Sequence, residues 1–163
     1  MSYINDILSA FETAIAASAT FGAAKIYQRE ELTADFGFPA DPSDAAPVNQ
    51  INVYLQPMEP RQHDTGFAID MRVYPIRVVI AFREETRART DVGTDPLVQR
   101  KSDYSDAMKT AMKTVSVSKV YDIEWVGPED LNFAPPEEKL DETSVEIGAI
   151  HRIAQTYECY AHP

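Results

Sequence analysis

The chain has 163 residues, with 26 acidic and 15 basic side chains and a formal net charge of −11. This charge argues against a nucleic-acid-binding protein, because such proteins neutralise phosphates with lysine and arginine. The length suits a single domain over residues 1–163, and no apolar run approaches the roughly 20 residues that a membrane-spanning helix needs, so we expect no membrane partner.

The N-terminal segment is expected to form a helix from Ser2 to Phe21, stopped by Gly22. Its apolar residues recur three or four positions apart, which is the period of one helix face. They are Ile4, Ile7, Leu8, Phe11, Ala14, Ile15 and Ala19. The polar face carries Asp6 and Glu12 and no basic residue, which favours packing on the domain's own sheet over binding at a membrane surface.

A short strand is expected over Ala23–Gln28, followed by a long loop over residues 30–50 that is rich in proline and small residues. Phe36 and Phe38 lie in this loop. Two interpretations are open for these phenylalanines. They pack on the domain's own core, or they anchor the loop to a neighbouring subunit, since exposed aromatic residues often anchor interfaces.

The segment Ile69–Arg83, IDMRVYPIRVVIAFR, has the alternation of a half-buried strand. The inward positions change parity at Pro75, which predicts one long strand bent there, at an edge or a bulge. The preceding run Ile51–Gln56 also alternates and is expected to pair with it as an antiparallel hairpin.

A charged loop over residues 84–95 leads to a second helix beginning at Asp95 and Pro96, an acidic N-cap followed by the proline favoured at the first position. A strand over Val120–Val126 is expected to end at Gly127-Pro128 and to open a loop over residues 127–144. A long alternating strand, Val145–Tyr160, closes the chain. The order predicts an α+β domain: a mainly antiparallel sheet with a long bent central strand and two helices packed on one face.

The sequence shows no catalytic, cofactor-binding or metal-binding motif. The three histidines are scattered with no partner at ligand spacing, and there is no glycine-rich phosphate loop. Cys159 lies near the end of a predicted strand, where a buried inert thiol is expected. The motifs of the sequence therefore give no support for an enzyme or for a cofactor.

Basic residues gather around the loop after the long strand, at Arg83, Arg87 and Arg89, with Arg77 nearby. Either they pair with local acids at the surface, or they meet an acidic patch on an identical neighbour in a head-to-tail contact. These arginines, with Phe36 and Phe38, are the candidate subunit-interface residues.

The order of the segments resembles the tail terminator, or tail completion, proteins of long-tailed bacteriophages over nearly the full length. The resemblance is carried by the N-terminal amphipathic helix, INVYLQP, VYPIRVVIAFR, the helix that starts at Asp95-Pro96, and IHRIAQTYECYA. The chain departs from the family pattern in two longer acidic insertions, Glu30–Gln50 and Glu129–Thr143.

The resemblance implies a structural virion protein, assembled in the host cytoplasm, that forms a ring, often a hexamer, at the head-proximal end of the tail. The ring caps the tail tube, stops its polymerisation and contacts the head connector. The ring would have no enzyme activity and no cofactor, and DNA passes through it without specific binding. Glu84, Glu85, Glu129 and Asp130 are candidates to line an acidic lumen that repels the phosphate backbone.

Two other classes remain open from the sequence. One is a different head–tail joining or neck protein, such as a head-closure protein. The other is a small ligand-binding or hydrolase domain with a pocket under the Gly37–Pro47 loop.

Overall fold

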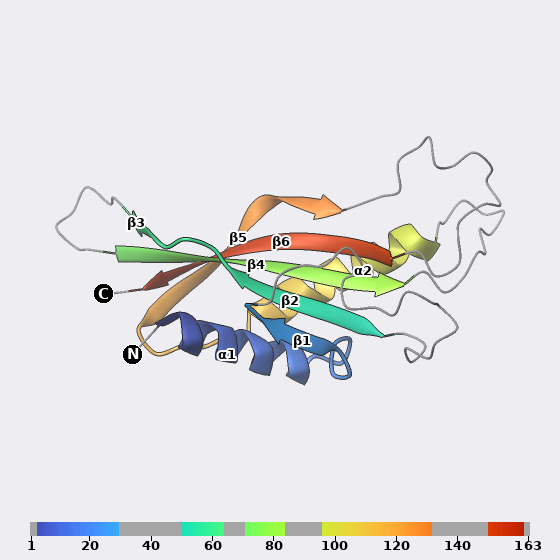
Figure 1. The fold of residues 1–163 in the computed structure, drawn as a ribbon, viewed down its shortest axis with the longest axis horizontal. Helices are drawn as coiled ribbons and strands as arrows, with labels where there is room; N and C mark the ends of the chain where they lie inside the picture. The colour runs from blue at the N-terminus through green and yellow to red at the C-terminus, as the bar shows by residue number, and fades with distance from the viewer. Residues whose placement is uncertain (1–2, 30–49, 64–70, 84–95, 132–149, 162–163) are drawn as a thin grey trace.

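The computed structural model describes residues 3–29, 50–63, 71–83, 96–131 and 150–161. Its elements are α1 (Tyr3–Ala17), β1 (Lys25–Gln28), β2 (Ile51–Pro57), β3 (Arg61–His63), β4 (Met71–Arg83), α2 (Pro96–Met112), β5 (Val120–Leu131) and β6 (Ile150–Ala161). Within the described residues the strands form one six-stranded sheet, in which the order is β1-β2-β4-β6-β5 and β3 also pairs with β4. Every pair is antiparallel except β1 with β2. The chain is therefore an α+β domain, as predicted (Figure 1).

The long strand β4 lies in the middle of this sheet, as the alternation predicted (Figure 1). It pairs with β2 from Ile76 to Phe82, and with β6 along twelve consecutive register positions from Arg72 to Arg83. The antiparallel hairpin of β2 and β4 is also confirmed. The connection between them contributes a short strand of its own, β3, which pairs with Met71–Val73 and was not predicted.

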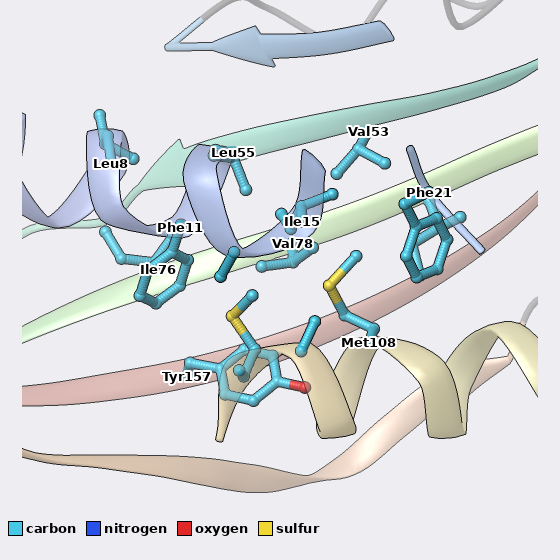
Figure 2. Close-up of a cluster of buried hydrophobic side chains, with 14 of the residues drawn as sticks. Leu8, Phe11, Ile15, Phe21, Val53, Leu55, Ile76, Val78, Met108 and Tyr157 are labelled. Carbon is cyan, nitrogen blue, oxygen red and sulfur yellow. The ribbon is translucent and has the colours of Figure 1, made fainter. Parts of the chain in front are cut away.

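Both helices cover the same face of the sheet, and the main core lies between the two layers. Figure 2 shows Leu8, Phe11 and Ile15 of α1 in one cluster with Leu55, Ile76 and Tyr157 of the strands and Met108 of α2. All of these side chains are buried, and the ring of Phe11 meets that of Tyr157 edge-on at 6.2 Å between centroids. Fully burying one such side chain contributes roughly 1.5–3 kcal/mol, so this face holds the layers together.

The predicted change of parity at Pro75 is wrong. Tyr74 belongs to the core cluster together with Ile76 and Val78, so one parity faces the helices along the whole strand. The register with β6 runs past Pro75 without a shift, so there is no bulge. On the other side the Met58 N–H donates to the Pro75 carbonyl at 2.9 Å. The nitrogen of Pro75 points to the same side, between the end of β2 and the start of β3, so the N–H that proline lacks costs the sheet no ladder hydrogen bond.

The first helix is shorter than predicted. It ends at Ala17, five residues before Gly22. The Ser18 N–H donates to the Ile15 carbonyl, and the Thr20 N–H donates to the Ser18 hydroxyl. A serine hydroxyl that accepts from a nearby backbone N–H in this way competes with the hydrogen bonds of the helix. The resulting turn places Phe21 back in the core, fully buried.

The later elements agree with the predictions except in their ends. Helix α2 begins at Pro96 as expected, and β6 begins at Ile150 within the described part of the chain. Strand β5 does not stop at Val126 but continues to Leu131, so the loop predicted from residue 127 begins later. Gly127-Pro128 lies at a register shift between Val126 and Asp130, where an edge strand tolerates a proline.

Candidate interaction surfaces

The face of the sheet away from both helices is the first candidate surface, here called the helix-free face. Its inner part is a second buried cluster of Tyr54, Val79 and Ala154, against which Tyr27 packs. The rings of Tyr27 and Tyr54 stack with centroids 4.7 Å apart and planes 14° from parallel. Larger polar side chains of the same parity surround this cluster. They include Lys25, Gln56, Arg77, Arg152, Thr156, Glu158, Tyr160, Asp122 and Glu124.

A polar network occupies one end of the helix-free face. Arg61 of β3 forms a salt bridge with Glu158 at 2.7 Å. The Tyr160 hydroxyl lies 2.9 Å from Glu158 and 3.3 Å from Glu124, so its one proton is shared between two carboxylates. Burial, then the hydrogen bond to Glu158 and the two negative charges, raises the pKa of Tyr160 to about 12. This end of the face is thus acidic and holds the tyrosine in its neutral form.

The two edges of the sheet are the second candidate surface. Among the described residues, β1 pairs only with β2, and β5 pairs only with β6. On β5, Asp122 and Glu124 are exposed on the helix-free face, and no basic residue occurs in the strand. At β1, Lys25 is exposed on that same face, and the exposed Arg29 follows the strand. The edges therefore carry opposite charge.

The helix side of these edges carries a different set of side chains. Trp125 of β5 is 45% exposed, and the Lys109 ammonium group of α2 lies over its ring at 4.4 Å from the centroid. At the other edge, Gln28 of β1 donates to the carboxylate of Glu12 on α1. Arg29 reaches back to the Asn5 side chain of the same helix. A large exposed tryptophan is unusual on a surface and is the residue type most often found at the centre of interfaces.

The basic residues predicted to form an interface are only partly described. Arg77 lies on the helix-free face of the central strand, between Gln56 and Thr156 in register. Arg83 has the same parity but lies six positions further along β4, roughly 20 Å away at the usual rise of a strand. The two backbone positions are thus well separated, and the side chain of Arg83 lies outside the described residues. Arg87, Arg89, Phe36 and Phe38 lie outside the described residues.

The acidic residues predicted to line a lumen also divide into two groups. Glu84 and Glu85 lie outside the described residues. Glu129 and Asp130 were expected in a loop, but the structure places them in the distal part of β5, where Asp130 pairs with Ala154. Their side chains lie outside the part of the chain that the structure describes.

Several buried polar residues were not anticipated from the sequence as a group. The Tyr157 hydroxyl donates to the Gln155 side chain at 2.7 Å, and Gln155 in turn donates to Ser105 of α2 at 3.2 Å. Lys101 of α2 and His151 of β6 are buried on the same side of the sheet. The signal was available, because Gln155 and His151 have the inward parity of β6 and Lys101 lies seven residues before Met108. These bonds join α2 to the sheet and face inward.

The described residues do not form a catalytic or metal-binding arrangement. Nowhere in this part of the chain do three His, Cys, Asp or Glu side chains gather as metal ligands. Cys159 is fully buried, and burial raises the pKa of its thiol to about 12, as expected for an unreactive cysteine. Of the helices described, neither has the length and apolar character needed to cross a membrane.

Comparison of the sequence with models of known protein families finds no match, and no curated protein matches it either. A functional conclusion therefore depends on the surfaces described above and on the order of the elements.

Proposed function

We propose that this chain is a structural virion protein that forms a ring at the head-proximal end of a phage tail, caps the tail tube and joins it to the head connector. The observation that carries the proposal is the arrangement of the segments on which the resemblance is based. INVYLQP, VYPIRVVIAFR and IHRIAQTYECYA are β2, most of β4 and β6, which are adjacent in the sheet. The two helices of the same pattern cover one face of these strands.

The surfaces also support a role in assembly. The charged side chains of the two sheet edges and the polar network of the helix-free face lie at the surface, where a protein contacts other proteins. The buried polar groups, such as Gln155, connect elements of the core. The ring would contact the tail tube protein on one side and the head connector on the other.

The net charge of −11 suits a ring through which DNA passes without specific binding. An acidic lumen repels the phosphate backbone, so DNA slides through it. Reversing the charge of Glu84, Glu85, Glu129 and Asp130 together is expected to slow DNA ejection and lower infectivity. Unchanged DNA ejection would contradict the assignment of these four acids to the lumen.

The first experiment measures the mass of the purified protein by native mass spectrometry and light scattering, alone and with purified tail tubes. We expect a closed assembly of about six copies, and tubes that stop elongating once it is added. A protein that neither self-associates nor binds tubes would contradict the proposal. A protein that assembles but binds only the head connector would instead be another neck protein.

A further inference from the structure

We propose that the β5 edge of one copy pairs with the β1 edge of the next copy, so that the sheet continues from subunit to subunit around the ring. This inference rests on the proposed function and specifies the contact that builds the ring. The partner surface is thus a second copy of this chain, in a head-to-tail contact that closes on itself.

The charges on the helix-free face are the first argument. Asp122 and Glu124 project from β5 on that face, and Lys25 projects from β1 on the same face. If two copies continue one sheet with their helices on the same side, these side chains become cross-strand neighbours. Opposite charges at such positions stabilise the pairing of two strands, and like charges destabilise it.

The helix side of the same two edges carries charged and aromatic groups, and its β1 part holds a cation as well, because Arg29 donates to Asn5 of α1. Lys109 and Trp125 lie on the β5 side, and Glu12 lies on the β1 side, where it accepts from Gln28. The contact would therefore place a cation and an exposed indole beside a carboxylate on one face, and carboxylates beside a lysine on the other. The helix-free face, where Asp122 and Glu124 project from β5 and Lys25 from β1, favours this pairing over pairing of β5 with β5 or of β1 with β1.

The directions and lengths of the strands also fit. β1 runs parallel to β2, and each further step from β2 to β4, β6 and β5 reverses direction. β5 therefore runs opposite to β1, and copies related by a rotation about an axis along the strands meet as an antiparallel pair. The regular stretch of β5 runs from Asp122 to Val126, between its two register shifts, and β1 has four residues. The shift beyond Val126 ends the pairing surface.

Two variants with opposite charge changes test the contact. In the first, Asp122→Lys and Glu124→Lys make the β5 edge basic; in the second, Lys25→Glu makes the β1 edge acidic. Each variant alone brings like charges together, so its dissociation constant for assembly is expected to rise by about tenfold or more. In an equimolar mixture the two variants can alternate around the ring, and every contact then joins a basic edge to an acidic edge. Assembly is therefore expected to return.

Asp103→Lys is the matched control, because Asp103 is exposed on α2, six residues before Lys109. It changes the charge by the same amount per residue and is expected to assemble like the wild type. Circular dichroism melts of every variant check that the monomers fold. Sedimentation velocity across protein and salt concentrations measures assembly, and recovery in the mixture supports the inference.

If the wild type forms rings and both edge variants form them equally well, the edge contact is wrong while the proposed function stands. Variants that fail alone and remain apart when mixed would also overturn it, because the two edges would then not be partners. A wild type that stays monomeric even on tail tubes would overturn both proposals together.

Discussion

Cys159 and Tyr160 are neighbours on β6 whose side chains face opposite sides of the sheet. Cys159 pairs in register with Tyr74 on the helix side and is fully buried there. Tyr160 lies on the helix-free face between Glu158 and Glu124. In both cases the pKa of the side chain is raised to about 12, from 9.0 for the thiol and 10.0 for the phenol. Both groups keep their proton in the folded state at pH values where the unfolded chain releases it.

The free energy of unfolding is therefore expected to fall as the pH rises from about 9 to about 12. The stabilising contribution of each group is complete below its unfolded pKa and is lost as the pH passes through its folded pKa. Urea titrations across this range for the wild type and for a Cys159→Ala, Tyr160→Phe double variant measure the effect. The double variant should lose stability with pH more gradually; an equal slope in both proteins would contradict the assignment.

At the scale of elements, Pro75 shows how a proline is accommodated in a central strand. Its carbonyl accepts from Met58, and β2 ends at Pro57, just before the position where the Pro75 nitrogen would have to donate. The strand neighbour then changes to β3, which begins to pair at Val73. The proline thus marks the end of one ladder and leaves β4 continuous.

Pro75→Ala is accordingly expected to cost less than about 1 kcal/mol of unfolding free energy, because no ladder bond depends on that nitrogen. Val78→Pro, three residues further in the same strand, is the comparison. It lies within both ladders of β4, so removing its N–H is expected to cost about 3 kcal/mol or more. Chemical denaturation of both variants gives the two values. Equal losses of unfolding free energy in the two variants would contradict the conclusion that no ladder hydrogen bond depends on the nitrogen of residue 75.

For the whole molecule, the charge of −11 is the property with the clearest consequence. The basic side chains of the helix-free face are separated by Tyr54, Val79 and Ala154 and by acidic neighbours, and they do not form the continuous stripe that follows a phosphate backbone. With this charge, the self-association that we propose would depend on local complementarity, such as that between the two sheet edges.

We expect no detectable binding of duplex DNA at roughly physiological salt, even with the protein at about 10 µM, because the acidic surface repels phosphates. Fluorescence anisotropy with a labelled duplex measures this, and a basic DNA-binding domain serves as the positive control. Tight binding that weakens steeply with salt would show a basic surface that the described residues do not form.

Much of the fold followed from the sequence because its signals are local. The alternation of β4 and β6, the apolar stripe of α1 and the proline at the start of α2 each act within one element, and the structure confirms them. The errors occurred where a partner decides the outcome. Tyr74 faces the core because its strand continues in register with β6, and β5 continues past Pro128 because β6 offers Ala154 and Ile153 as partners.

By itself, the sequence determined the class of the domain, its order of elements, its acidic charge and the buried state of Cys159, because hydrophobic periodicity and composition are properties of the chain alone. Only the tertiary structure decided which surfaces are available. It made β1 parallel to β2 and left β1 and β5 at opposite edges. It also placed Trp125 beside Lys109 and brought Gln155 to Ser105. Such contacts join residues far apart in the chain, and the register of the sheet, which no local pattern specifies, determines them.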